Sequence, residues 1–109
     1  MMTDLAFYIR AVKNNTAVVC LEQRQEKDLL AEVESHYSLW RHDSGVTLRC
    51  IRENELVAET ENVCPECWIL WEIVDACGQT IRPLKKQFHN ACQEAFWLQR
   101  QHAEQQIAR

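Results

Sequence analysis

The sequence predicts a mainly α-helical small domain, on three observations. Its 109 residues include only two glycines and two prolines, fewer than many short strands with their turns would need. Apolar residues recur with a seven-residue period over residues 5–40, the spacing of a long helix or a coiled coil. Helix start and stop signals follow in the C-terminal half. We therefore expect a single domain over residues 1–109, with a helical region at 1–62 and a helical hairpin at 63–109.

Residues 3–41 are predicted to form one helix, or two that break at Asn14-Asn15. Thr3 or Asp4 can cap its start. The repeating positions are Leu5, Ile9, Val12, Thr16, Val19, Gln23, Glu26, Leu30, Val33, Tyr37 and Trp40. This stripe is expected to pack on the domain's own core. The alternative is a helical partner or a homodimer that uses the 5–40 apolar seam.

The pattern changes after Asp43-Ser44-Gly45, which ends the helical spacing. Residues 46–51 alternate between apolar and polar side chains, as a short strand does. Residues 56–58 are read as the returning strand, which gives a β-hairpin at 46–58. A helix over residues 47–59 is the alternative.

Four residues in the C-terminal half have the chemistry of a zinc site. Pro65 begins a predicted helix that Gly78 ends, and a second helix begins near Pro83. If these helices are antiparallel, a Cys-x2-Cys pair and a His-x2-Cys pair meet across the hairpin. Thiolate and imidazole groups in two such pairs are the ligands of structural Zn²⁺. The predicted ligands are Cys64, Cys67, His89 and Cys92, and Cys77 replaces His89 or Cys92 in an alternative register.

The same four residues allow a different fold, because residues 68–74 are also strand-prone. Residues 68–84 would then form a β-hairpin, and His89 and Cys92 would open the following helix. Over residues 64–92 this arrangement resembles a small Cys-Cys-His-Cys zinc-binding module of the treble-clef kind, including the first module of LIM-type fingers. The resemblance implies an α+β zinc finger. The chain departs from it at Trp68, where those modules usually have a small residue.

The sequence Cys64-Pro65-Glu66-Cys67 also resembles the Cys-Pro-x-Cys active site of glutaredoxin-like thiol oxidoreductases. That resemblance implies Cys64 as the nucleophile and Cys67 as the resolving thiol. The βαβ context that such enzymes need is missing after Cys67. A non-enzyme is therefore expected, and thiol-disulfide exchange is the enzyme alternative.

Charge and aromatic content bear on the partners. The net charge of −4 and the pI near 5.5 argue against a large nucleic-acid footprint. Arg82, Lys85 and Lys86 nevertheless form a basic cluster that can contact phosphates, so a nucleic-acid-binding zinc-finger regulator is the alternative function. Aromatic residues exceed what a small core needs, which favours a protein partner. They concentrate in one half of the chain, at Trp68, Trp71, Phe88, Phe96 and Trp97.

No apolar run is long enough to span a membrane, so a cytoplasmic protein is expected. Together these observations predict a small zinc-binding accessory or regulatory protein that acts by protein-protein binding, as an adaptor or an inhibitor. Its size and acidity suit a protein encoded by a phage or a mobile element.

Overall fold

The computed structural model describes residues 2–55 and 66–107, with side chains at residues 3–55 and 66–101, and it is built mainly of β-strands. The predicted mainly α-helical class, and the description of the protein as helical, are therefore wrong. The described elements are, in chain order, β1 (Met2–Asp4), α1 (Leu5–Lys13), β2 (Val18–Asp28), β3 (Val33–His42), β4 (Thr47–Glu55), β5 (Cys67–Asp75), β6 (Thr80–Arg82), β7 (Lys85–Phe88) and α2 (Ala91–Ile107).

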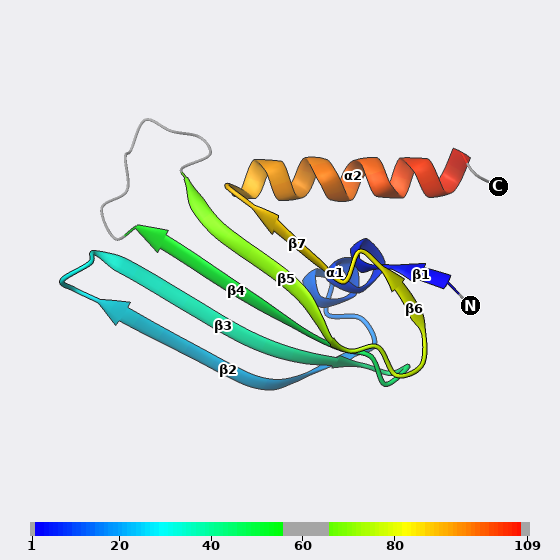
Figure 1. Cartoon of the computed structure of the whole chain (residues 1–109), viewed down its shortest axis with the longest axis horizontal. Helices are drawn as coiled ribbons and strands as arrows, with labels where there is room; N and C mark the ends of the chain where they lie inside the picture. Colours follow the sequence, from blue (N-terminus) through cyan, green and yellow to red (C-terminus); the bar gives the residue numbers. More distant parts are fainter. Residues whose placement is uncertain (1, 56–65, 108–109) are drawn as a thin grey trace.

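Five strands form one antiparallel sheet in the order β2-β3-β4-β5-β7 (Figure 1). β1 and β6 form a separate parallel pair, in which Met2 aligns with Thr80 and Asp4 with Arg82. The large sheet combines strands from both halves of the chain. Figure 1 shows α2 lying along the β7 side of the sheet.

The predicted long helix over residues 3–41 exists only as α1. The helix ends at Lys13, and the left-handed residues Asn15 (φ +50°) and Ala17 (φ +58°) redirect the chain. The rest of the 5–40 seam is the β2–β3 hairpin, in which Val33 and Tyr37 lie on one face of the sheet and Trp40 on the other. A continuous helical stripe is therefore absent from this part of the chain.

The strand predicted at residues 46–51 is confirmed as part of β4. It pairs with β3 and β5 within a larger sheet. The predicted return at residues 56–58 lies outside the described residues, but β4 continues through Glu55, so the turn that a hairpin at 46–58 needs before residue 56 does not form. Gly45 has φ +93° in the turn between β3 and β4, a conformation that glycine adopts without steric cost.

The predicted helical hairpin at residues 63–109 is also wrong. Residues 67–75 form strand β5, as the strand-prone alternative has it. Gly78 (φ +78°) lies in the turn after β5 and does not end a helix. The one described helix of this half is α2, which starts only at Ala91. The strand preference of the Trp-Ile-Leu-Trp-Glu-Ile-Val run therefore overrides the helix start signal at Pro65.

The hydrophobic core lies between the sheet and the two helices. Alternate residues of the strands supply its floor, with Leu48, Ile69 and Trp71 buried. Ile9 on α1 and Leu98 on α2 cover them. Polar side chains such as Ser38, Arg52 and Asn54 continue the same face towards the end of the sheet that the helices leave bare.

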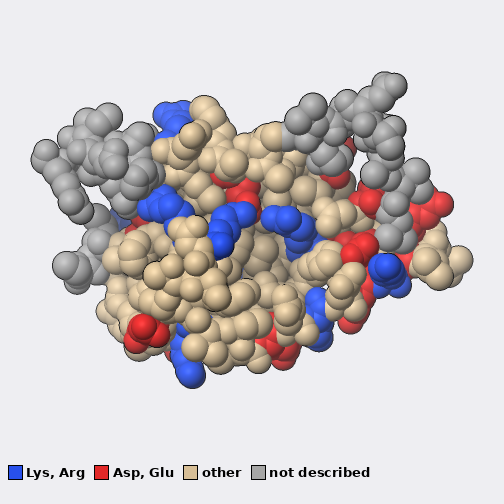
Figure 2. All heavy atoms as spheres, turned by 180° about the vertical axis from the view of Figure 1, so that it is seen from behind, with Lys and Arg blue, Asp and Glu red and all other residues tan. Residues whose placement is uncertain are grey.

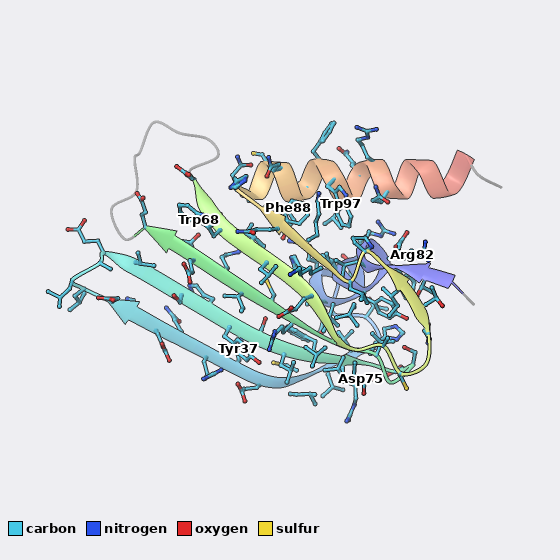
Figure 3. All side chains as sticks on the ribbon, in the orientation of Figure 1. Tyr37, Trp68, Asp75, Arg82, Phe88 and Trp97 are labelled. Atoms are coloured by element: carbon cyan, nitrogen blue, oxygen red, sulfur yellow. The ribbon has the colours of Figure 1, made fainter. Side chains whose placement is uncertain are left out.

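The opposite face of the sheet has a different composition. Tyr37, Ile51 and Leu70 align across β3, β4 and β5 and are half-buried. Trp68 is 39% exposed, and Figure 3 labels Tyr37 on β3 and Trp68 near the start of β5. Within the described residues no helix covers this face.

Candidate functional site

Three of the four predicted zinc ligands lie near the start of α2. Cys67 is buried at the first position of β5, and its backbone N–H donates a hydrogen bond to the carbonyl oxygen of His89 at 2.9 Å. Cys92 lies in the first turn of α2 and is disulfide-bonded. Cys64 lies outside the described residues. The zinc hypothesis therefore requires the reduced chain, in which the Cys92 sulfur can become a thiolate ligand.

Among the described residues, no group of three His, Cys, Asp or Glu side chains is arranged to hold a metal ion. The four-ligand site is not tested by this, because one of its members is not described, and it remains a prediction from the sequence. Cys67 begins β5, and Cys77 lies two residues after the strand ends at Asp75. A strand of that length separates the two thiols by roughly 30 Å.

The thiol-oxidoreductase alternative needs an activated cysteine. Burial raises the pKa of the Cys67 thiol, which disfavours its thiolate form. The positive charge of Arg52 lowers the pKa of the same thiol, but this effect is smaller than that of burial. This finding concerns the predicted resolving thiol only, because the predicted nucleophile, Cys64, lies outside the described residues.

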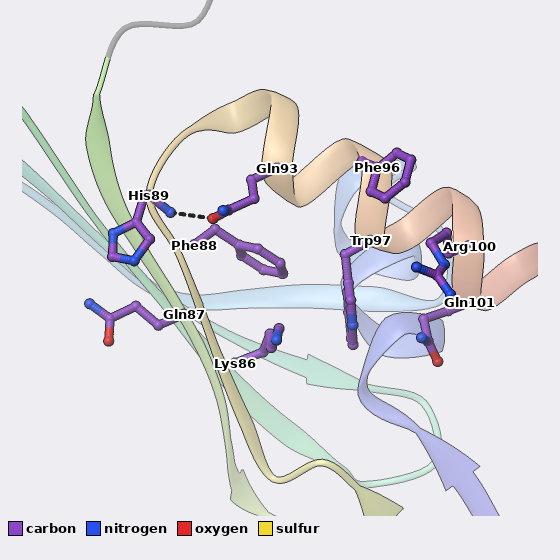
Figure 4. Close-up of a pocket in the computed structure, with 9 residues that line it drawn as sticks. All are labelled: Lys86, Gln87, Phe88, His89, Gln93, Phe96, Trp97, Arg100 and Gln101. Atoms are coloured by element: carbon purple, nitrogen blue, oxygen red, sulfur yellow. Dashed lines mark hydrogen bonds between the residues drawn. The ribbon is translucent and has the colours of Figure 1, made fainter.

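The described residues form a groove between β7 and α2. It encloses about 520 Å³ and opens beside β7, the last strand of the sheet in this part of the chain. Figure 4 shows β7 on one side and α2 on the other. The lining residues are Lys86, Gln87, Phe88, His89, Gln93, Phe96, Trp97, Arg100 and Gln101.

Local sequence fixes how α2 leaves β7. Asn90 caps the helix, because its Oδ1 accepts a hydrogen bond from the Gln93 N–H at 2.7 Å. In turn, the Gln93 Oε1 accepts a hydrogen bond at 2.8 Å from the N–H of His89, the residue before Asn90 (Figure 4). This reciprocal capping sets the angle at which the helix runs beside the strand.

Glu94 holds α2 against the sheet. Its side chain is only 2% exposed, and its Oε2 accepts a hydrogen bond from Trp71 Nε1 at 2.7 Å. Lys13 at the end of α1 places its Nζ 2.5 Å from Glu94 Oε1. These contacts join α1, β5 and α2, so that the walls of the groove are supported from behind.

Aromatic side chains form the apolar part of the groove. The rings of Phe88 and Trp97 pack with their centroids 5.5 Å apart, and both point into the space between β7 and α2 (Figures 3 and 4). Phe96 is 60% exposed on α2. Most of the aromatic area of Phe96 is therefore available to a ligand.

The described lining residues carry positive charge and include no carboxylate. Lys86 Nζ lies 5.9 Å from the ring centroids of both Phe88 and Trp97, and Arg100 Cζ lies 5.9 Å from that of Phe96. Of the basic cluster predicted from the sequence, only Lys86 lines the groove. Lys85 precedes Lys86 in β7 and points to the other face of the sheet, and Arg82 ends β6.

The sequence indicated part of this site. Its aromatic residues and Lys86 were visible as a concentration of aromatic and basic residues in the C-terminal half. Gln87, Gln93 and Arg100 were missed as site residues. Once β7 and α2 are known, their periodicity indicates which residues share the groove. Residues 93, 97 and 100 recur with helical spacing on one side of α2, and side chains alternate along β7.

No helix among the described residues is long and apolar enough to cross a membrane. No family model, curated protein or solved structure matches the chain.

Proposed function

We propose that this protein is a peptide-binding module that takes up an extended, acidic segment of a partner protein in the β7–α2 groove. The observation that carries the proposal is a groove of about 520 Å³ with an aromatic floor and a basic rim, running beside the last strand of the sheet. Extended peptides bind such sites by adding a strand to the sheet.

The backbone of β7 supports this mode. The Ile73 N–H donates to the Leu84 carbonyl oxygen at 2.7 Å. Ile73 on β5 and Leu84, just before β7, therefore form a hydrogen-bonded pair of the antiparallel ladder. Because this register alternates, the backbone groups of Lys86 and Phe88 face β5 and those of Lys85 and Gln87 face away from it. The outward pair can donate and accept hydrogen bonds with an added strand.

The side chains define what the peptide must contain. Phe96 and Trp97 offer apolar contact to an aliphatic or aromatic anchor residue, and the buried Phe88 ring packs against Trp97. Lys86 and Arg100 favour glutamate or aspartate at neighbouring positions. A volume of about 520 Å³ is within the range of sites that bury a few side chains.

Binding of single-stranded nucleic acid is the competing function, since bases also stack on aromatic side chains beside cations. The strand edge favours the peptide, because its backbone groups have no role in base stacking. The net charge of −4 also opposes a long polyanion more than a short acidic peptide.

Fluorescence anisotropy tests the proposal with a labelled short peptide in which glutamate alternates with valine or phenylalanine. We expect saturable binding that weakens with salt. Phe96→Ala, at an exposed position, should weaken it about tenfold, or ~1.4 kcal/mol. Lys86→Glu should weaken it further.

Three controls accompany this measurement. Lys27→Glu lies on the exposed far edge strand β2 and should leave binding unchanged. A peptide with lysine in place of glutamate should not bind. Tighter binding of an oligothymidylate than of the acidic peptide would contradict the proposal and favour the nucleic-acid alternative.

A further inference from the structure

A second hollow lies on the helix-covered side of the sheet, beside the C-terminal turn of α1. It has a volume of about 320 Å³ and shares no residue with the β7–α2 groove. Figure 2, which views the molecule from behind, shows lysine, arginine and acidic side chains gathered around a hollow on this side. The lining residues are Val12, His36, Ser38, Trp40, Cys50, Arg52, Asn54 and Trp71.

Among the described lining residues, Arg52 is the one side chain with a permanent charge. Its Nη2 lies 3.9 Å from Glu94 Oε1, which is too long for a hydrogen bond. The Glu94 carboxylate is instead bonded by Lys13 and by Trp71 Nε1. Glu94 therefore holds Arg52 in place by charge while leaving the guanidinium donors unused by that carboxylate.

Two further polar side chains lie beside Arg52 on the same face of the sheet. Asn54 is two residues further along β4, and Ser38 on β3 is the register partner of Cys50. Within the described residues neither the Asn54 amide nor the Ser38 hydroxyl has a side-chain hydrogen bond. The hollow thus presents a guanidinium, an amide and a hydroxyl to its contents.

Apart from His36, whose Nε2 lies 2.7 Å from Glu34 Oε1, the rest of the described lining is apolar. Trp40 and Trp71 rise from β3 and β5 on the two sides of β4, and Val12 contributes from α1. Indole rings favour flat apolar groups by offset or edge-on packing. A volume of about 320 Å³ is at the lower end of the range for small-molecule sites, which suits a ligand with a single ring.

We infer that this hollow is a binding site for a small organic acid, whose carboxylate pairs with Arg52 and whose flat apolar part packs on Trp40, beside the largely buried Trp71 ring. Arginine recognises carboxylates through two parallel N–H donors, and Asn54 or Ser38 can complete the hydrogen bonds of the same group. The positive charge of Arg52 disfavours an amine of equal size. This site goes beyond the proposed peptide binding and does not depend on it.

Benzoate is the probe for the experiment, and two-dimensional NMR of ¹⁵N-labelled protein is the readout. We expect benzoate to shift the indole N–H signals of Trp40 and Trp71 saturably, with a Kd near or below ~1 mM. Benzamide and benzylamine, which have the same ring without the carboxylate, should bind at least about tenfold more weakly. Inorganic phosphate should not saturate the same signals, because it has no apolar part.

Arg52→Gln should weaken benzoate binding at least about tenfold, whereas Arg24→Gln on β2 should leave it unchanged. Asn54→Ala provides a second test that leaves the charge next to Glu94 intact, and it should weaken binding severalfold. The inference is overturned if benzoate shifts no indole signal at about 10 mM, if benzamide or phosphate binds as tightly, or if folded Arg52→Gln protein keeps the full affinity. Loss of peptide binding in the groove would leave these results unaffected.

Discussion

Glu94 shows how a single residue determines where an element lies. A carboxylate that is 2% exposed would cost several kcal/mol without partners. The Lys13 ion pair and the Trp71 hydrogen bond offset that cost only when α2 lies against α1 and β5. The position of α2, and with it the β7–α2 groove, therefore depends on these polar contacts as well as on Leu98.

Cys50 makes the stability of the protein sensitive to alkaline pH. Burial raises the pKa of its thiol to about 12, while a cysteine in the unfolded chain titrates near 8.5. The folded state therefore keeps its proton over a range in which the unfolded state loses it. Stability from this residue is fully present below about pH 8.5 and falls by at most ~1.4 kcal/mol per pH unit up to about pH 12.

Urea unfolding at a series of alkaline pH values measures this effect. Cys50→Ala should flatten the decline of the unfolding free energy relative to the unchanged protein. Cys20→Ala, at an exposed thiol, is the matched control and should not flatten it. Equal slopes for all three proteins would show that the Cys50 thiol is not protected by the fold.

Strands β2 and β3 differ in how their backbones are used, although they are neighbours. β3 pairs on both sides, with β2 and with β4, whereas β2 is the far edge of the sheet among the described strands. The His42 N–H donates to the Val46 carbonyl oxygen at 2.8 Å, so even-numbered residues of β3 direct their backbone groups to β4. Their register partners on β2, such as Gln23, direct theirs away from the sheet.

Proline substitution at two register partners tests this difference. Ser38→Pro removes a ladder hydrogen bond in the middle of the sheet and should cost about 3 kcal/mol or more. Gln23→Pro, directly opposite on the edge strand, loses no ladder bond and should cost much less. Chemical denaturation monitored by circular dichroism gives both values. Similar losses at the two positions would contradict the assigned edge.

At the scale of the whole molecule, the two described helices cover one face of the sheet, and no described helix covers the other. Ile69 lies on the covered face and is fully buried, whereas Ile51 lies on the open face and is half-buried. Ile69→Ala should therefore lower the free energy of unfolding by about 2–5 kcal/mol. Ile51→Ala removes the same atoms from a partly hydrated site and should cost clearly less.

Thermal and urea unfolding of both variants provide the comparison. A cost at Ile51 that equals the cost at Ile69 would mean that something covers the open face in solution. Analytical ultracentrifugation would then show whether a second copy of the chain provides this cover.

The errors in the sequence prediction have a common cause. Val33, Tyr37 and Trp40 fit a helical seven-residue spacing, yet in β3 the first two lie on the opposite face from the third. Spacing within one segment cannot distinguish these cases, because a strand that is half-buried on both faces does not alternate cleanly. The sparse glycine and proline content misled for a related reason: residues in the described turns such as Asn15, Ala17 and Glu32 adopt positive φ in place of glycine.

The sequence by itself determined the features that depend on composition and on neighbouring residues. These include the turn at Gly45, the strand that follows it, the acidic net charge, and the concentration of aromatic and basic residues after Trp68. Only the tertiary structure decided that residues 18–42 form a hairpin, that β7 is the last of the described strands in the sheet, and that Lys86 and Trp97 share a groove. The reason is that strand pairing and helix docking depend on contacts between distant residues, and local preferences are too weak to specify them.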